Sequence, residues 1–190
     1  MDLLRRSRLI SGDLVLTDPP FEMKAEQVKD AIANLASNFI VAGCGREHHR
    51  LCTMKPFRYF FEVISQRTKP QSLPEMQGAQ ILHWGNAFLT LGDRHSFDRD
   101  LADGYFPSVM PPHKSEIQGD YSKPLEWAIA LLKVCHSQII CDTFAGTGTV
   151  LIACEKLGKT CNAIEIQPRL CSLIIARWEN ATKQKATLLS

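Results

Sequence analysis

The stretch Leu14-Val15-Leu16-Thr17-Asp18-Pro19-Pro20-Phe21 changes abruptly from an apolar run to an acid, two prolines and an aromatic ring. The apolar run predicts a strand over 13–18. The two prolines have no backbone N–H, so a sheet ladder cannot continue through them and the strand must end there. The sequence therefore predicts that the Asp18 carboxylate lies at the carboxyl end of a strand, which is where open α/β sheets bind ligands.

A second stretch of the same kind lies near the other end of the chain. Ile139-Ile140-Cys141-Asp142 predicts an apolar strand that ends in an acid. Thr143-Phe144-Ala145-Gly146-Thr147-Gly148-Thr149 then predicts a turn of small residues that opens a helix. We expect these two stretches to face each other across one active site.

The remaining chain divides into strands and helices by its hydrophobic periodicity. Helices are expected over 24–36, from an N-cap at Ser122, over 148–157 and over 168–180, and further strands over 38–43, 57–65, 81–91, 138–142 and 160–166. The strands at 57–65 and 81–91 suggest an antiparallel hairpin, with a loop at 69–74 and a break at Gly85-Asn86. The alternation after residue 138 predicts a parallel sheet there.

Composition sets the broad class of the protein. With 190 residues, 45% apolar and 22% charged, the chain fits one globular domain. No run approaches the ~18 apolar residues of a membrane span, and the first residues do not form a signal peptide. The seven cysteines are an odd number and scattered, which favours an intracellular location. The net charge of +2 does not indicate nucleic acid, but clusters at Arg5–Arg8, 46–50 and 94–99 either contact phosphates or form a solvated surface.

The glycine turn has three possible ligands. A P-loop needs a Gly-Lys-Ser/Thr sequence that is absent, and a dinucleotide turn needs a third glycine where Leu151 stands. S-adenosylmethionine needs only a compact turn past its methionine part. Glu165 is expected to end the next strand, where a carboxylate can bind both ribose hydroxyls. The plain alternative is a tight corner with a surface glutamate.

The Asp-Pro-Pro-Phe stretch fits methyl transfer to an exocyclic amine of a nucleobase. The lone pair of such an amine is delocalised, and two acceptors on its N–H bonds would localise it. Asp18 can supply one acceptor, and the Pro19 carbonyl can supply the other because the Pro-Pro pair holds it extended. Phe21 can stack on a base that has left the duplex. The alternative is a Pro-Pro turn with a solvated Asp18.

These motifs resemble those of a known family. Asp18-Pro19-Pro20-Phe21 resembles the catalytic motif of amino-methyltransferases that act on adenine N6 or cytosine N4 in DNA. The stretch from Asp142 to Thr149 resembles their cofactor motif, and Ser122-Lys123-Pro124-Leu125-Glu126 resembles the segment that closes over the methionine end. The catalytic motif comes first, as in the β group of this family, many of whose members belong to phages or restriction–modification systems.

The resemblance implies a fold, a reaction and a set of residues. The fold is expected to be α/β and Rossmann-like, with a mainly parallel seven-stranded sheet, one antiparallel strand and helices on both faces, formed by residues 1–190 as a single methyltransferase domain. The reaction is expected to be direct transfer of a methyl group from S-adenosylmethionine to adenine N6 in double-stranded DNA after base flipping, in the cytoplasm of a bacterial or phage-infected cell. The implied catalytic residues are Asp18, Pro19, Pro20 and Phe21, and the implied cofactor-binding residues are Asp142, Thr143, Phe144, Ala145, Gly146, Gly148, Thr149, Glu165, Lys123 and Pro124.

Several alternatives stay open. An Asp at the start of the catalytic motif favours adenine over cytosine in the family, but N4-cytosine methylation uses the same chemistry. Methylation of RNA or of a protein glutamine can use a similar tetrapeptide, and a DNA-binding relic without turnover would keep both motifs.

The chain departs from the family in two places. Only 13 residues precede Leu14, where family members usually carry another strand and helix that help to hold the cofactor adenine. The target-recognition segment, at 92–121, is short. Because base readout needs several placed side chains, we expect a short or relaxed target sequence, or recognition shared across a homodimer.

Two other chemistries are disfavoured. Cys44, His48, His49 and Cys52 match no strong zinc-ligand spacing, and methyl transfer needs no metal. A cytosine-C5 methyltransferase would use a cysteine after a proline, and no cysteine here follows one.

Overall fold

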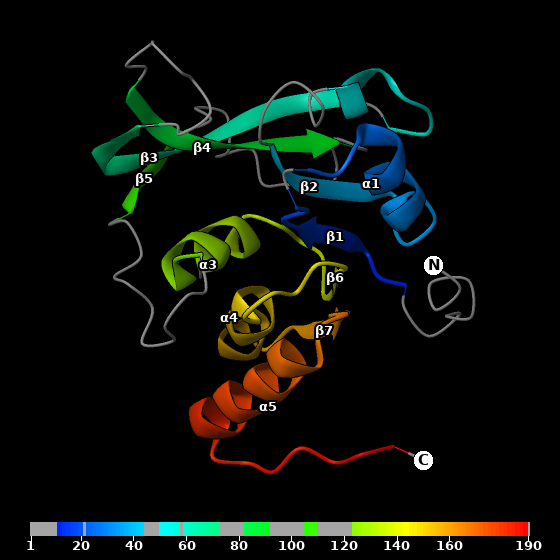
Figure 1. Ribbon diagram of the computed structural model, residues 1–190, viewed down its shortest axis with the longest axis vertical. Coiled ribbons are helices and arrows are strands. Elements are labelled where there is room, and N and C mark those ends of the chain that lie inside the picture. The colour runs from blue at the N-terminus through cyan, green and yellow to red at the C-terminus, as the bar shows by residue number, and fades with distance from the viewer. Residues whose placement is uncertain are drawn as a thin grey trace.

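A computed structural model describes residues 11–20, 22–43, 50–57, 59–72, 82–91, 105–109 and 123–189; for Gly43, 59–72, 82–91 and 105–109 it describes the backbone alone. Figure 1 shows how the strands and helices of this chain are arranged. In chain order the elements are β1 (Leu14–Thr17), α1 (Ala25–Ile32), β2 (Asn38–Gly43), the 3₁₀ helix η1 (Arg50–Thr53), β3 (Tyr59–Ser72), β4 (Leu82–Leu91), β5 (Tyr105–Val109), α3 (Leu125–Lys133), β6 (Ile139–Asp142), α4 (Thr149–Leu157), β7 (Thr160–Ala163) and α5 (Pro168–Thr182).

The described strands form one seven-stranded sheet in the order β5-β3-β4-β2-β1-β6-β7. Strand β4 is antiparallel to both of its neighbours, β2 and β3. The pairings β1–β2, β1–β6, β6–β7 and β3–β5 are all parallel. The predicted fold class, with a mainly parallel sheet and one antiparallel strand, is therefore confirmed, and so is the hairpin of β3 and β4.

Helices cover both faces of the sheet, so β1 is buried on both sides. Leu14 and Leu16 pack with Trp127 on the face that carries α3 and α4. Val15 points to the opposite face, where it packs with residues of α1 that include Val28. A parallel strand buried on both faces is apolar throughout, which explains why the sequence of β1 shows no polar alternation.

The strand register brings the two predicted stretches together. Val15 of β1 lies opposite Cys141 of β6, and the two strands run parallel. Their carboxyl ends therefore lie side by side at one edge of the sheet, just before the prolines that follow Asp18 and the glycine turn that follows Asp142 (Figure 1). The expectation that the two stretches meet in space is confirmed.

The strands at the far side of the sheet differ from the prediction. Strand β3 continues to Ser72, so the loop expected at 69–74 is wrong for 69–72. A register irregularity between Gln66 and Gln71 explains this, because a bulge accommodates Pro70 without a ladder hydrogen bond. Strand β4 runs unbroken through Gly85-Asn86, and β5 pairs with β3 inside the segment 92–121, where no strand was expected.

Three boundaries near the site also differ. Helix α3 begins at Leu125 with Pro124 as its N-cap, so the N-cap predicted at Ser122, which lies outside the described residues, is wrong. Helix α1 ends at Ile32 instead of residue 36, because a turn closed by the Leu35 N–H and the Ile32 carbonyl leads into β2. Strand β7 ends at Ala163, so Glu165 lies beyond the strand.

No helix in the described part of the chain is long and apolar enough to cross a membrane.

Candidate active site

Asp18 lies at the carboxyl end of β1, as predicted. The chain then turns: Pro19 is buried, Pro20 is exposed, and the Pro20 carbonyl accepts a hydrogen bond from the Met23 N–H at 3.0 Å. This turn carries the chain away from the sheet and leaves the Asp18 side chain at its edge. Phe21, the expected stacking ring, lies outside the described residues.

The two oxygens of the Asp18 carboxylate have different surroundings. Oδ2 forms an ion pair with the Nζ of Lys123, and both side chains are about one-quarter exposed (28% for Asp18 and 26% for Lys123). Oδ1 is buried and has no hydrogen-bond partner among the residues that the structure describes. A buried carboxylate oxygen without a donor is costly, which makes Oδ1 a candidate acceptor for a ligand N–H.

Asp142 ends β6 and lies in the interior, only 3% exposed. Its Oδ1 accepts hydrogen bonds from the Thr17 hydroxyl at 2.8 Å and from the Phe144 N–H at 3.3 Å. Burial raises the pKa of Asp142 to about 7; the hydrogen bonds from Thr17 and Phe144 oppose this shift, and the charges of Asp18 and Glu165 add to it. Asp142 thus holds the end of β1 to the start of the glycine turn.

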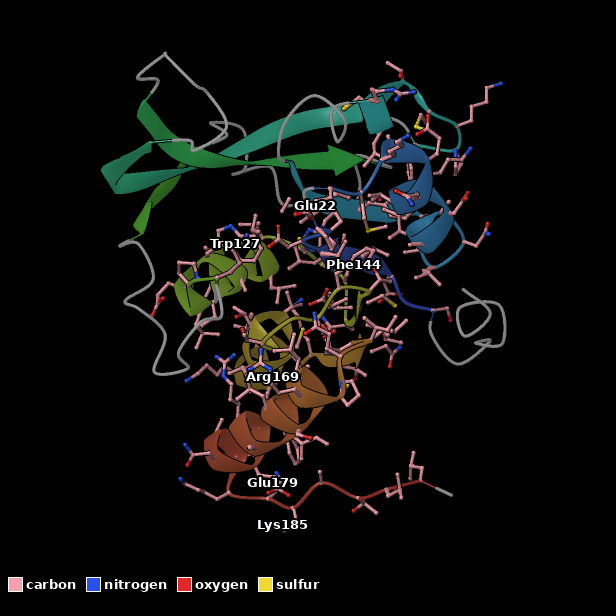
Figure 2. All side chains as sticks on the ribbon, in the orientation of Figure 1. Glu22, Trp127, Phe144, Arg169, Glu179 and Lys185 are labelled. Carbon is pink, nitrogen blue, oxygen red and sulfur yellow. The ribbon has the colours of Figure 1, made fainter. Side chains whose placement is uncertain are left out.

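Thr17 is a site residue that the sequence analysis did not single out. Its hydroxyl donates to Asp142, accepts the Phe144 N–H at 3.2 Å, and lies 3.4 Å from the Thr143 hydroxyl. Phe144 lies beside β1, while Trp127 lies on α3 (Figure 2). The signal in the sequence was a polar residue at the end of an otherwise apolar strand, directly before Asp18.

The glycine turn is held in place by backbone geometry. Gly148 has a φ of 80° as the N-cap of α4, and its N–H donates to the Ala145 carbonyl at 2.7 Å. A Cβ at Gly148 would lie 3.0 Å from the side chain of Ile174 on α5. A side chain at this position is therefore disfavoured both by the positive φ and by this close contact. Arg177 on α5 donates to the Thr147 carbonyl, and the sequence analysis did not anticipate this contact.

Glu165 bridges the turn and the segment after β7. Its Oε2 accepts the Gly146 N–H at 2.8 Å, and its Oε1 accepts the Gln167 N–H at 2.9 Å. Ile164 still donates to the Asp142 carbonyl at 2.8 Å and accepts the Ala145 N–H at 3.0 Å, so the chain leaves the sheet at Glu165, whose carboxylate accepts N–H groups of the turn and of Gln167. The next residue, Ile166, is 86% exposed.

Lys123, which precedes Pro124, contacts both the catalytic stretch and the end of the glycine turn. The Lys123 carbonyl accepts a hydrogen bond at 3.2 Å from the hydroxyl of Thr149, a buried residue at the start of α4. The Lys123 side chain reaches Asp18, and Pro124 begins α3. The predicted cofactor role of Lys123 and Pro124 stays a prediction.

No group of three or more His, Cys, Asp or Glu side chains that could hold a metal occurs among the described residues. Of the four residues weighed for zinc, Cys44, His48 and His49 lie outside those residues, and Cys52 lies in η1.

The similarity of this chain to known proteins is found among solved structures. No protein-family model matches this chain, and no curated protein matches it. The chain resembles the solved structure of the M1.HpyAVI–SAM complex, with a TM-score of 0.71 at 15% identity, covering 88% of this chain and 89% of that one. It also resembles TTHA0409 of Thermus thermophilus complexed with S-adenosyl-L-methionine, with a TM-score of 0.69 at 18% identity, covering 95% and 90%.

A third similar structure is the PvuII DNA methyltransferase, which is cytosine-N4-specific. Its TM-score is 0.69 at 14% identity, covering 95% of this chain and 86% of that one. At such identities the likeness concerns the fold. The chain therefore has the Rossmann-like α/β fold of these structures over most of its length.

Proposed function

We propose that this chain is a DNA amino-methyltransferase that uses S-adenosylmethionine to methylate the N6 of adenine in double-stranded DNA. One observation carries the proposal: the buried Oδ1 of Asp18, which has no hydrogen-bond partner in the described part of the chain, lies at the sheet edge beside the glycine turn. The similar structures support it, since two were solved with S-adenosylmethionine and one is a DNA methyltransferase. The same likeness supports treating the described elements as one methyltransferase domain.

The residues at the end of β6 and β7 fit the proposed cofactor. Each Glu165 oxygen accepts one backbone N–H and keeps a second lone pair, so the carboxylate can still accept bonds from ribose hydroxyls. Beside it, the exposed Ile166 offers an apolar surface that suits one face of an adenine ring. Within the described part of the chain a Cβ at Gly146 would meet only the Phe144 carbonyl, at 3.9 Å, which leaves room for a ligand on this side of the turn.

We assign the cofactor to the residues implied by the sequence. The turn residues would lie along its methionine part, Glu165 would hold its ribose, and Asp142 would keep the turn in place through Thr17 and Phe144. When bound, S-adenosylmethionine supplies a methyl group activated by the sulfonium. The full proposed set is Asp142, Thr143, Phe144, Ala145, Gly146, Gly148, Thr149, Glu165, Lys123 and Pro124.

The catalytic stretch would prepare the target amine for attack. Asp18 Oδ1 and the Pro19 carbonyl each accept one N–H, which localises the nitrogen lone pair for in-line attack on the methyl carbon. As the N–C bond forms, the bond from the methyl carbon to the sulfonium breaks and its electron pair returns to sulfur, which would leave as a neutral thioether. The nitrogen then loses one proton, and Asp18 is the acceptor already in contact with it. Pro20 stiffens the corner, and Phe21 is assigned to stack on the flipped base.

The second candidate is N4-cytosine methylation, which the likeness to the PvuII enzyme favours. The exocyclic amines of adenine and cytosine present the same two N–H bonds to Asp18 and Pro19. The acidic first residue of the motif favours adenine. Enzymatic digestion of methylated DNA followed by mass spectrometry of the nucleosides separates 6-methyladenine from 4-methylcytosine.

The biological setting belongs to the same proposal. We assign the role to a restriction–modification or phage system, acting in the cytoplasm, with 92–121 as the target-recognition segment. Of that segment only β5 is described. A homodimer would let two such short segments read one site.

The proposal is tested by offering the purified chain three substrates with radiolabelled S-adenosylmethionine: unmethylated duplex DNA, RNA and protein. We expect label in duplex DNA only, and loss of that label with Asp18→Ala. Label in RNA or in protein glutamine would reassign the substrate. Cofactor binding without label in any substrate would identify a binding relic.

A further inference from the structure

The Asp18 carboxylate divides its two oxygens between two environments. The Lys123 ammonium pairs with Oδ2 on the partly exposed side, and Oδ1 is buried on the other. A carboxylate free to rotate would offer either oxygen to a substrate amine. Here the ion pair fixes the plane of the group, so the two oxygens are no longer equivalent.

The backbone of Lys123 is held through its own carbonyl and through the residue that follows it. Its carbonyl accepts the Thr149 hydroxyl at the first turn of α4, and the next residue, Pro124, is the extended N-cap of α3. Thr149 is only 6% exposed. Lys123 is therefore tied to the first turns of α3 and α4, and holding its side chain at Asp18 costs less entropy than it would from a segment without such contacts.

The pairing with Asp18 also keeps the Lys123 charge away from the cofactor sulfonium. A sulfonium carries a positive charge, so an ammonium held against it would be repelled. Paired with Asp18, the ammonium is neutralised and remains near the site without opposing the cofactor. The ion pair with Asp18 agrees with this distribution of charge.

We propose that Lys123 is a positioning residue of the catalytic corner: it holds Asp18 through Oδ2 and so leaves Oδ1 as the one acceptor for the target amine. The inference rests on the proposed function and reassigns Lys123 from the cofactor to the amine-binding group. Two N–H bonds then meet two different acceptors, Oδ1 of Asp18 and the carbonyl of Pro19. Because Oδ2 is held by Lys123, the Asp18 carboxylate accepts only one of the two N–H bonds.

The test compares Lys123→Met, Lys123→Arg and the control Lys133→Met, whose exposed lysine lies in the last turn of α3, the helix that follows Lys123. For Lys123→Met we expect kcat to fall about 30- to 100-fold, because a mispositioned group can cost about 100-fold in rate. Cofactor affinity, measured by calorimetry with S-adenosylmethionine, is expected to stay within about 2-fold, as for a group that touches no cofactor. Lys123→Arg should recover most of the rate because it retains the cation, and Lys133→Met should match the wild type.

A double-mutant cycle shows whether Lys123 acts through Asp18. On an Asp18→Asn background, Lys123→Met should cost less than about 3-fold in kcat, since residues that act as a unit are not additive. The melting temperatures of the same four proteins, measured without ligands, should show the same coupling. An additive cycle in both measurements overturns the inference.

Other outcomes also decide the question. A cofactor affinity that falls more than about 10-fold in Lys123→Met with kcat unchanged would make Lys123 a cofactor residue. A rise in kcat would make the ion pair a lock that the substrate must break. If the wild type labels no DNA, the proposed function fails; the inference is still decided by the coupling of melting temperatures and by the cofactor affinity of Lys123→Met.

Discussion

Asp18 and Asp142 lie at the carboxyl ends of two neighbouring parallel strands, yet their carboxylates have opposite surroundings. Asp142 is 3% exposed and accepts hydrogen bonds from Thr17 and Phe144. Asp18 is partly exposed, pairs with Lys123 through one oxygen and keeps the other buried without a described partner. Residue type and strand position therefore do not fix the role of an acid. A satisfied acid organises a turn, whereas an acid with one unsatisfied oxygen is available to a substrate.

The largest expected effect separates the two acids by activity. Asp18→Asn replaces the proposed acceptor by an amide, and we expect kcat to fall about 100- to 1,000-fold, the range measured when one preorganised transition-state contact is lost. The free energy of unfolding should change by less than about 1 kcal/mol, because a partly exposed ion pair contributes little. Methyl-transfer kinetics and urea unfolding measure the two quantities. A variant that loses stability and activity together would make Asp18 a structural residue like Asp142.

The second prediction concerns pH. The pKa of Asp142 is raised by burial to about 7, so between the unfolded pKa and 7 the folded state binds a proton that the unfolded state has lost. The stabilisation from Asp142 is therefore complete below about pH 4 and declines as the pH rises to 7, by as much as about 4 kcal/mol. Asp142→Asn should remove this decline. Urea unfolding of both proteins at pH 5 and pH 8 tests it, and parallel pH profiles would contradict it.

The third prediction addresses the contact between the two strand ends. Thr17→Val keeps the side-chain shape and removes the hydroxyl shared by Asp142 and Phe144. We expect a loss of about 2 kcal/mol in unfolding free energy, with a larger loss above pH 7, where a charged Asp142 needs the donor most. Thr17→Ser is the matched control and should restore stability. Equal stability of Thr17→Val and the wild type at pH 8 would remove Asp142 from its proposed organising role.

The smallest effect comes from a third acid, at the opposite end of β1. The exposed Asp13 accepts hydrogen bonds at 3.0 Å from the N–H groups of Ile139 and Gln138, and these bonds lower its pKa. Its stabilisation is therefore present above the unfolded pKa and is lost as the pH falls, opposite in sign to that of Asp142. Asp13→Asn should cost about 1 kcal/mol or less at pH 7, since solvent screens the exposed group. A cost that is larger at pH 3 than at pH 7 would contradict this assignment.

The sequence predicted the centre of the fold well and its periphery less well. Strands β1, β2 and β6 are short apolar runs with clear ends, because prolines or small turn residues stop each ladder, and their bounds agree closely with the prediction. The extension of β3 to Ser72 and the pairing of β5 depend on partner strands that are distant in sequence. Local propensity carries no information about such partners.

The candidate site was predictable to a similar extent. The sequence brought Asp18 and Asp142 to one edge of the sheet, since parallel strands end at the same edge. It did not predict that the Lys123 side chain pairs with Asp18, because that contact depends on where α3 packs. It also missed Thr17, whose partners are more than 120 residues away along the chain.

The most direct test of the account is a single-turnover experiment with enzyme in excess over an unmethylated DNA duplex and radiolabelled S-adenosylmethionine. Wild type and Asp18→Ala are compared after both are shown to be folded and to bind the cofactor equally. The account predicts that the wild type transfers label to the N6 of adenine in one rapid phase and that Asp18→Ala transfers none on that timescale. Equal transfer by both proteins, or no label in DNA with either, would contradict it.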